Sequence, residues 1–314
     1  MQSLRRVILP TRRQPAIHAT IGSVMTHRHH ERVLSWYSAH SRDLPWRRPD
    51  ASPWAVLVSE VMLQQTPVAR VLPAYQAWLE RWPTPAALAG SPAGEAVRQW
   101  GRLGYPRRAL RLHAIAGILV QRHGGQVPAC HAELLDLPGI GSYTAAAVAS
   151  FAFGQRHAVL DTNVRRVLAR LISGTQVAGP AVSVAEARLA ESLLPADPAV
   201  AARWSVAVME LGALVCTAAR PRCTECPLAA ECSWLRAGRP QAAPRRGGQR
   251  YTGTDRQCRG ALLAVIREAH GPVSGPQLTA AWPEPARRSR ALDGLVADGL
   301  VEAHADDMFS LPGV

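Results

Sequence analysis

The chain has 314 residues, 47% of them hydrophobic, which is enough for two domains and a small third one with buried cores. Its formal net charge of +13 favours a polyanionic partner, with nucleic acid first, although a coding bias toward arginine would give the same charge. No apolar run is long enough to span a membrane or to form a signal peptide, so we expect a cytoplasmic protein without a membrane partner.

In chain order, the sequence predicts a basic arm, a helical core, a linker and a small C-terminal module. Residues 1–26 are basic and contain prolines, which is typical of a disordered arm. Amphipathic helices of about 10 to 15 residues, separated by Pro, Gly, Asp or Ser, fill residues 27–236. A Pro/Gly/Arg-rich linker spans residues 237–252, and residues 253–314 form three helices and a hairpin, an arrangement that resembles a winged helix. The sequence leaves open whether this module contacts DNA or only packs on the core.

One acidic residue stands among apolar ones early in the core, in the stretch SEVMLQQTPVAR. Glu60 falls on a predicted helix whose neighbouring positions are apolar, which leaves little room for a solvated face. A partly buried carboxyl has a raised pKa and can act as an acid near neutral pH. Thr66 and Pro67 are expected to begin the next helix as N-cap and first helical residue, so Gln64 and Gln65 lie at a helix end, facing solvent or a ligand.

A glycine-rich turn follows, in the stretch LPGIGSYTAAAVASFAFG. One helix ends at Leu135, the turn contains Gly139 and Gly141, and the next helix begins at Ser142 or Tyr143. Glycines let backbone N–H groups approach an anion, and the N-terminus of the second helix adds a favourable dipole. The pattern predicts a helix-hairpin-helix that grips a DNA phosphate without reading bases, although any helix pair can use a glycine turn.

A second carboxylate precedes a periodic helix in the stretch HAVLDTNVRRVLARL. Asp161 is well placed as a helix N-cap, as is Asn163, and capping alone would explain it. Together, Glu60 and Asp161 also suit cleavage of an N-glycosidic bond. One carboxylic acid then protonates the leaving base, and one carboxylate stabilises an oxocarbenium-like sugar.

Four cysteines stand close together near the end of the core. Their spacing is C-x6-C-x2-C-x5-C, at Cys216, Cys223, Cys226 and Cys232. In a cytoplasmic protein, thiols so close in sequence are metal ligands, because disulfides would be reduced there. The spacing alone admits either a structural zinc ion or an iron-sulfur cluster. The remaining two, Cys130 and Cys258, are isolated, and we expect buried thiols there.

Taken together, these stretches make the chain resemble the helix-hairpin-helix DNA glycosylases that carry an iron-sulfur cluster, and among them the adenine DNA glycosylases of the MutY type. The likeness covers about residues 34–234 and rests on LPWR, SEVMLQQT, LGYPRRA, LPGIGSYTA, LDTNVRRVLAR, MELGALVC and the four-cysteine loop, in that order. It implies an all-α, two-lobed fold in which a six-helix barrel, about residues 48–155, faces a cluster domain of residues 27–47 and 156–236. It also implies a [4Fe-4S] cluster on the four cysteines and a cleft that holds kinked DNA.

The resemblance assigns roles to individual residues. Glu60 matches the acid that protonates the adenine ring and then helps to deliver water. Asp161 matches the carboxylate that stabilises the sugar cation, with Asn163 and Tyr143 beside it. Base extrusion costs a few kcal/mol, so residues that hold the flipped adenine, fill its gap or wedge beside the opposite base are expected. Those positions match Trp46, Arg47, Leu63, Val68 and Glu210 for the adenine pocket, Gln65 for the gap, and Thr66, Leu103 and Tyr105 beside the opposite base.

Relatives that also nick the backbone have a lysine nucleophile at the position of Tyr143. All 36 Lys and Arg residues of this chain are arginine, so no side chain can form a Schiff base with a sugar aldehyde. The resemblance therefore implies a monofunctional hydrolase that leaves an abasic site and starts base excision repair. Longer family members add a Nudix-like domain that recognises 8-oxoguanine, and residues 252–314 are too short and too helical for it. We expect removal of adenine opposite 8-oxoguanine and also opposite G or C.

Two other functions stay open. A pyrimidine or thymine-mismatch glycosylase of the same superfamily is the runner-up. A non-catalytic iron-sulfur DNA-binding regulator is the third possibility, and the presence of both Glu60 and Asp161 argues against it. For the enzyme we expect a monomer that acts on double-stranded DNA and is associated with the bacterial nucleoid.

Overall fold

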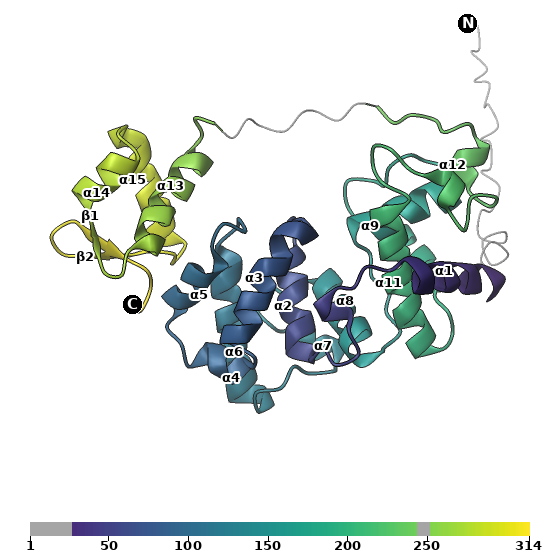
Figure 1. Cartoon of the computed structure of the whole chain (residues 1–314), viewed down its shortest axis with the longest axis horizontal. Helices are drawn as coiled ribbons and strands as arrows, with labels where there is room; N and C mark the ends of the chain where they lie inside the picture. The colour runs from purple at the N-terminus through teal and green to yellow at the C-terminus, as the bar shows by residue number, and fades with distance from the viewer. Residues whose placement is uncertain (1–26, 244–251) are drawn as a thin grey trace, which may run out of the picture.

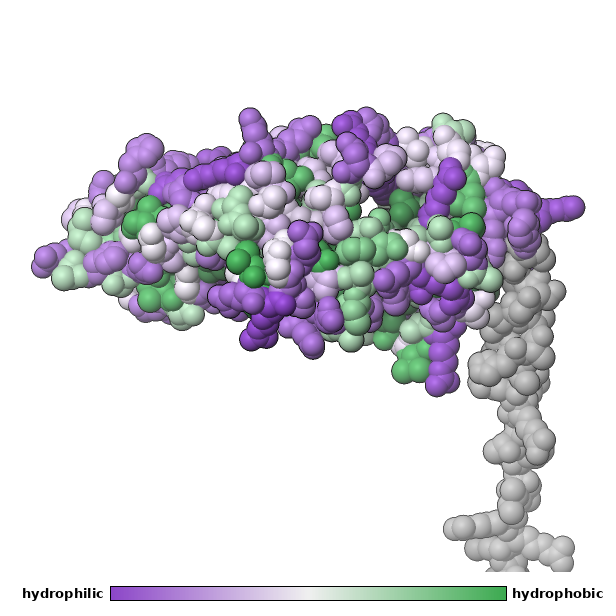
Figure 2. Space-filling view, turned by 90° about the horizontal axis from the view of Figure 1, so that it is seen from below, coloured by the Kyte–Doolittle hydropathy of each residue, from purple (hydrophilic) through white to green (hydrophobic). Residues whose placement is uncertain are grey.

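The computed structural model describes residues 27–243 and 252–314, in which helices predominate. Two helical lobes lie side by side, and a C-terminal module lies against the first lobe, so the molecule is elongated (Figure 1). The predicted arm and half of the predicted linker, residues 1–26 and 244–251, fall outside the described residues. The face in Figure 2 carries hydrophilic and hydrophobic residues interspersed. None of the helices described is long and apolar enough to cross a lipid bilayer.

The first lobe is a group of helices around a shared apolar core. Ser52 and Thr84 cap the first turns of two of these helices, and each is followed by proline, the residue best suited to the first helical position. Trp78, Trp100 and Leu112 are among the side chains buried at its centre. The helices are α2 (Pro53–Leu63), α3 (Val68–Arg81), α4 (Pro85–Ala89), α5 (Ala93–Trp100), α6 (Arg107–His123), α7 (His131–Leu135) and α8 (Ser142–Phe153).

The second lobe is built around one long apolar helix, α11, which contacts α1 and α9. Asp197 caps α11 through its carboxylate and is also followed by proline. This lobe has its own core, separate from that of the first lobe. Its elements are α1 (His27–His40), α9 (Thr162–Leu168), the π-helical turn η4 (Ala169–Ser173), α10 (Val184–Ser192), α11 (Pro198–Leu214), the 3-10 turn η5 (Cys223–Glu225) and α12 (Ser233–Arg236). The short helix η3 (Pro45–Arg47) leads from α1 to α2, and its Trp46 belongs to the core of the first lobe.

The C-terminal module has the three helices and the hairpin that the sequence predicts. Its small antiparallel sheet has the strand order β1-β3-β2, with Val273 paired to Phe309 and Ala303 also paired to Phe309. The apolar side chains of α13, such as Leu262, belong to the same core cluster as the first lobe. The elements are α13 (Asp255–Glu268), β1 (Val273–Ser274), α14 (Gly275–Ala281), α15 (Pro285–Ala297), β2 (Glu302–His304) and β3 (Met308–Ser310).

Two local predictions are wrong. Thr66 is not the N-cap of the helix that follows it: Pro67 holds that position, and the Thr66 hydroxyl instead accepts a hydrogen bond from Arg108 at 3.0 Å. Cys130 is exposed rather than buried, because it precedes the short surface helix α7. Cys258 is fully buried, as expected.

Candidate active site

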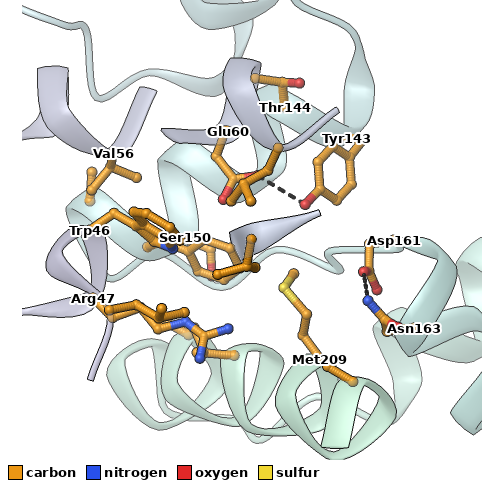
Figure 3. A pocket seen from close by; sticks show the side chains of 18 of the residues that line it. Trp46, Arg47, Val56, Glu60, Tyr143, Thr144, Ser150, Asp161, Asn163 and Met209 are labelled. Atoms are coloured by element: carbon orange, nitrogen blue, oxygen red, sulfur yellow. Dashed lines mark hydrogen bonds between the residues drawn. The ribbon is translucent and has the colours of Figure 1, made fainter. Parts of the chain in front are cut away.

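A cavity of about 1160 Å³ brings together segments that lie far apart in the sequence (Figure 3). Helices α2 and α8 of the first lobe supply one side, and the start of α9 together with α11 supplies the other. Most of the predicted site residues line it, namely Trp46, Arg47, Glu60, Leu63, Gln65, Thr66, Val68, Gly141, Tyr143, Asp161 and Asn163. Leu103, Tyr105, Gly139, Glu210 and the four clustered cysteines are not among its lining residues.

Glu60 lies on α2 and is 4% exposed, so the predicted burial is correct. The helix is apolar on nearly all sides, and Glu60 lies among its buried residues. Burial raises the pKa of Glu60 to about 7, and the negative charge of Asp161 adds to the increase. The Tyr143 hydroxyl donates a hydrogen bond to Glu60 Oε2 at 2.9 Å and partly offsets it. At neutral pH this carboxyl is therefore close to half protonated.

Asp161 has the N-cap role that the sequence allowed, and it also lines the cavity. Its Oδ1 accepts from the backbone N–H of Val164 at 2.6 Å, which makes it the N-cap of α9. Its Oδ2 accepts from Asn163 Nδ2 at 2.7 Å, and Arg166 in turn donates to Asn163 Oδ1 at 2.7 Å. Burial raises the pKa of Asp161, and the two donors oppose that increase. The carboxylate is thus held in one orientation toward the cavity (Figure 3).

Tyr143 lies in the first turn of α8, directly after the glycine turn, and faces α2. Burial raises its pKa well above the usual value, and the nearby Glu60 and Asp161 charges act in the same direction. The side chain therefore remains a neutral phenol at any physiological pH. It can donate a hydrogen bond to the acid beside it, and it cannot act as a phenolate nucleophile.

Glu210 stands behind the cavity rather than in it. Its carboxylate is fully buried on α11 and accepts from Arg42 Nε and Nη2 and from Arg47 Nη1, each at 2.7 Å. Burial would raise the pKa of Glu210, but these two guanidinium groups outweigh it and lower the pKa to about 2. The structure thus assigns Glu210 the task of fixing Arg47, which does line the cavity. Arg42 was not predicted, because only the fold brings it to a residue 168 positions away.

The corner between α2 and α3, Gln64 to Thr66, is held by an arginine that the sequence did not single out. Arg108 is 4% exposed, and its guanidinium donates to the carbonyls of Val61, Met62 and Gln64 at 2.6–3.0 Å. It also donates to Gly104 O at 2.9 Å. The corner is tight, with Gln65 at a φ of 55°, so a fixed donor array is needed to keep it in place. No local pattern marks Arg108 among the neighbouring arginines.

The turn after Gly101 presents an aromatic ring outside the cavity. Tyr105 is 55% exposed and has a φ of 50°, in the left-handed region that non-glycine residues rarely adopt. Its ring lies over the Arg108 guanidinium at 5.4 Å, a cation–π distance. Leu103 is buried beneath the turn, and Leu103 O accepts from the Thr66 hydroxyl at 3.5 Å. The same arginine therefore holds this turn and the Gln64–Thr66 corner together.

The predicted helix-hairpin-helix is present as α7, a turn and α8. Gly139 has a φ of +76°, which favours glycine, and a Cβ there would lie 2.7 Å from Arg111 Cδ, so this side chain would have to shift for any other residue. Gly141 is the N-cap of α8, and no atom lies within 4 Å of the place its Cβ would occupy. The turn thus has open space in front of a helix N-terminus, where an anion is favoured.

The four-cysteine loop packs on the second lobe and is attached to it by two arginines. Arg166 donates to Cys216 O at 2.7 Å, and Arg170 donates to Thr217 O at 2.8 Å and to Cys216 Sγ at 3.4 Å. Burial raises the pKa of Cys226 to about 11, and the charges of Cys216, Cys232 and Cys223 all act in the same direction. The four thiols therefore lie within electrostatic reach of one another. Across residues 27–243 and 252–314, no group of three or more His, Cys, Asp or Glu side chains is spaced to hold a metal ion.

Ser150 is a lining residue that sequence reasoning missed. It follows Tyr143 by two turns on α8, it is 1% exposed, and its hydroxyl has no hydrogen-bond partner among the described residues. A buried hydroxyl without a partner is unfavourable, and such groups in native proteins usually have a ligand or a bound water as partner. A serine within an alanine-rich helix carries no sequence signal of this kind.

Comparison with known proteins places this site in a family context. The pattern of the HhH-GPD superfamily of base excision DNA repair proteins matches residues 58–192. An adenine DNA glycosylase of Mycolicibacterium smegmatis is 52% identical over 90% of this chain and 95% of its own. A human adenine DNA glycosylase is 45% identical over 64% of this chain and 38% of its own. The solved structure of a thermostable thymine-DNA glycosylase is similar at a TM-score of 0.61 and 27% identity, covering 70% of this chain and 98% of that one.

Proposed function

Because the chain belongs to the adenine DNA glycosylases of the HhH-GPD superfamily, we propose that it removes adenine from double-stranded DNA as the first step of base excision repair. The fold expected from the sequence, a helical helix-hairpin-helix glycosylase with a small C-terminal sheet, is the observed one. One observation carries the proposal. A buried carboxyl, Glu60, and a half-buried one, Asp161, share one cavity, and Glu60 has a pKa of about 7.

In the proposed reaction, Glu60 is the acid and Asp161 the stabilising carboxylate. Protonated Glu60 gives its proton to a ring nitrogen of the flipped adenine, and the glycosidic C–N bond breaks with its electron pair going to the base. The sugar becomes an oxocarbenium-like cation, which the Asp161 carboxylate stabilises. Water then bonds to the cationic carbon and gives its proton to the Glu60 carboxylate, so the acid is restored. Neutral Tyr143 keeps the Glu60 carboxyl in position throughout.

Adenine itself would lie against Trp46 and Leu63, with Arg47 at its polar edge. Arg47 is suited to this because the buried Glu210 carboxylate orients its guanidinium. Glu60→Gln should lower the rate of adenine release by about 100-fold or more, which is the usual contribution of a general acid, while DNA binding persists. A variant that loses DNA binding in the same proportion would instead indicate a structural role for Glu60.

The reaction is proposed to be hydrolytic only. The lyase branch of such chemistry needs an amine nucleophile, and here the corresponding position is Tyr143, whose pKa is raised well above its usual value. No lysine occurs anywhere in the sequence. Purified enzyme incubated with substrate DNA and borohydride should therefore give no covalent protein–DNA complex, and a trapped complex would contradict the proposal.

For the base opposite adenine, we propose that 8-oxoguanine is preferred and that G or C is tolerated. The proposed contacts are the corner at Gln65 and Thr66 and the exposed ring of Tyr105, because Arg108 joins the two segments. Single-turnover release from duplexes with A opposite 8-oxoguanine, G, C or T, at one stated salt concentration, tests this. No release from any duplex would overturn the adenine proposal and favour the thymine-mismatch alternative.

The four-cysteine loop is proposed to hold a [4Fe-4S] cluster on Cys216, Cys223, Cys226 and Cys232. Support for this proposal comes from the four cysteines of one loop, whose charges act on one another, and from two arginine side chains that donate to the loop, where a cluster with thiolate ligands would be anionic. In the structure the four thiols are not spaced to hold a metal ion, so the loop would have to draw them together around the cluster. The cluster would tie the loop to α9 and thereby support Asn163 and Asp161 through Arg166. Iron and sulfide analysis of the purified protein distinguishes it from a zinc site.

A further inference from the structure

Helices α5 and α13 meet at the junction between the first lobe and the C-terminal module (Figure 1). An arginine of each helix donates hydrogen bonds to backbone carbonyls at the C-terminal end of the other. Arg98 on α5 donates to the carbonyls of Arg267 and Ala269 at the end of α13, the latter at 2.7 Å. Arg267 on α13 donates to Gly101 O at the end of α5, at 2.5 Å. The last carbonyls of a helix lack intrahelical donors and carry partial negative charge, so each guanidinium is well placed. These reciprocal hydrogen bonds therefore fix the relative orientation of α5 and α13 as well as their contact.

The other end of α5 is held by the same module. Gly94 N donates to Pro312 O at 2.8 Å. A Cβ at Gly94 would lie 2.6 Å from Val314 Cγ2 and 2.7 Å from Leu311 Cβ, so the segment after β3 packs directly on this helix. Because both ends of α5 contact the module, α5 cannot shift unless the module shifts with it.

Helix α5 leads directly into the turn that carries the exposed side chain of Tyr105. The turn begins at Gly101, the carbonyl that Arg267 binds, and continues to Gly104, whose carbonyl Arg108 binds. Arg108 also binds Gln64 O and the Thr66 hydroxyl, which belong to the cavity wall. A continuous path therefore runs from the module to the corner of the cavity and to the exposed ring. It consists of the hydrogen bond at Gly101, the backbone of the turn, the hydrogen bonds of Arg108 and the cation–π contact of Arg108 with the Tyr105 ring.

The module is less suited to reading DNA on its own. In a winged helix, the third helix enters the groove, and the counterpart here is α15. Its arginines are engaged within the module: Arg287 pairs with Asp255 and Glu284 at 3.2 Å, and Arg288 donates to the carbonyls of Trp282 and Pro283. Arg290 lies 3.8 Å from the Asp255 carboxylate.

We propose that the C-terminal module is a brace for the Gly101–Tyr105 turn, and that its Arg267 is a positioning residue for selection of the base opposite adenine. The module acts through Tyr105 and the Gln64–Thr66 corner and does not touch the reacting atoms. This inference rests on the proposed function, because it concerns the opposite base of the same reaction.

The experiment compares Arg267→Met with Arg267→Lys in the full chain. Methionine keeps the unbranched apolar part of the side chain and removes the donor to Gly101 O, whereas lysine can still donate to that carbonyl. Arg256→Met is the matched control, since Arg256 is exposed on the same helix. Two quantities are measured: the ratio of single-turnover adenine release opposite 8-oxoguanine to that opposite G, and amide hydrogen exchange of residues 101–105.

We expect Arg267→Met to lower the release ratio about tenfold, the effect of one charged hydrogen bond, and to speed exchange in residues 101–105. Arg267→Lys should restore most of both, and Arg256→Met should change neither. An unchanged ratio and unchanged exchange in Arg267→Met would overturn the brace. A lower affinity for every duplex with the ratio intact would instead make the module a DNA-binding element.

A second pair of variants tests the brace from the other end of α5. Gly94→Ala forces a Cβ against Leu311 and Pro312, while Gly117→Ala, on α6, meets nothing within 4 Å. Gly94→Ala should reproduce the effects of Arg267→Met, and Gly117→Ala should not. If wild-type protein releases adenine from no duplex, the proposed function fails, and hydrogen exchange alone still decides whether the module restrains the turn.

Discussion

The carboxyl of Glu60 ties stability to pH in a direction opposite to that of most acids. Its pKa is about 7 in the folded protein, against 4.5 for an ordinary glutamate, so the folded state binds this proton more tightly than the unfolded chain does. Its favourable contribution is complete below pH 4.5 and is lost as the pH rises to 7. Glu60→Gln should therefore gain stability relative to wild type over that window, by about 3 kcal/mol at pH 8.

Denaturant unfolding of wild type and Glu60→Gln at pH 5 and pH 8 measures this difference. Glu80→Gln, at an exposed position of α3, is the matched control and should show no such dependence. A Glu60→Gln variant that is equally stable relative to wild type at both pH values would mean that the carboxyl is not desolvated. In that case Glu60 would also lose its suitability as an acid at neutral pH.

The unpartnered hydroxyl of Ser150 predicts that its removal makes the protein more stable but less active. A buried hydroxyl without a hydrogen bond destabilises a protein by about 1–3 kcal/mol, so Ser150→Ala should raise the free energy of unfolding by about 1 kcal/mol. Because Ser150 lines the cavity, the same change should slow adenine release severalfold. Ser205 on α11 is the control: its hydroxyl is equally buried and unpartnered within the described residues but does not line the cavity.

Ser205→Ala should therefore stabilise the protein and leave adenine release unchanged. Thermal unfolding and single-turnover release are measured on both variants. If Ser150→Ala is stabilised and its release rate is unchanged, the hydroxyl makes no contact with the bound nucleotide. Equal slowing in both variants would point to rigidity of the lobes rather than to a contact in the cavity.

At the scale of single elements, the two glycines of the hairpin between α7 and α8 are predicted to act differently. Gly139→Ala places a Cβ at a φ of +76° and 2.7 Å from Arg111 Cδ, so it should lower the free energy of unfolding by about 1–2 kcal/mol. Gly141→Ala has an ordinary φ and open space, so it should leave stability nearly unchanged. Its added methyl faces the space proposed for a DNA phosphate, and it should weaken DNA binding.

Urea unfolding and DNA binding at one salt concentration separate the two effects. If DNA affinity falls in proportion to the free energy of unfolding in both variants, the loss of affinity follows from lost stability. That result would contradict a phosphate site at this turn. The prediction does not depend on which base is excised, because a phosphate contact carries no sequence information.

Local chemistry accounts for the elements that the sequence predicted correctly. The end of α2 before Gln64, the start of α8 at Ser142 and the capping of α9 by Asp161 each follow from residues within one or two turns. The prediction for Thr66 was wrong because its hydroxyl binds Arg108, which is distant in the sequence, and does not cap the helix that follows. Local pattern alone could not show this.

The same limit explains the site residues that were missed. Arg42 meets Glu210 across 168 positions, and Arg98 meets Ala269 across 171. These residues meet only in the folded protein, and an arginine-rich sequence contains many arginines that could equally well be the partner. Glu60 could be found because a lone acid in an apolar helix is unusual wherever its partners lie.

At the scale of the whole molecule, the distribution of the cores predicts which parts unfold together. The apolar core of the first lobe continues through α13 into the C-terminal module, whereas the second lobe has a separate core around α11. A buried leucine removed from a shared core weakens every element that packs on it. The first lobe and the module should therefore behave as one cooperative unit and the second lobe as another.

Leu262→Ala in α13 and Leu211→Ala in α11 test this division, because both leucines are fully buried and each substitution should cost about 2–5 kcal/mol. Native-state hydrogen exchange should show lost protection in α6 for Leu262→Ala and in α1 for Leu211→Ala, with the opposite lobe little affected. If Leu262→Ala loosens only α13 to α15, the module is a separate domain that folds on its own. The reciprocal arginines at α5 would then be a surface contact, too weak to hold the turn before Tyr105 against thermal motion.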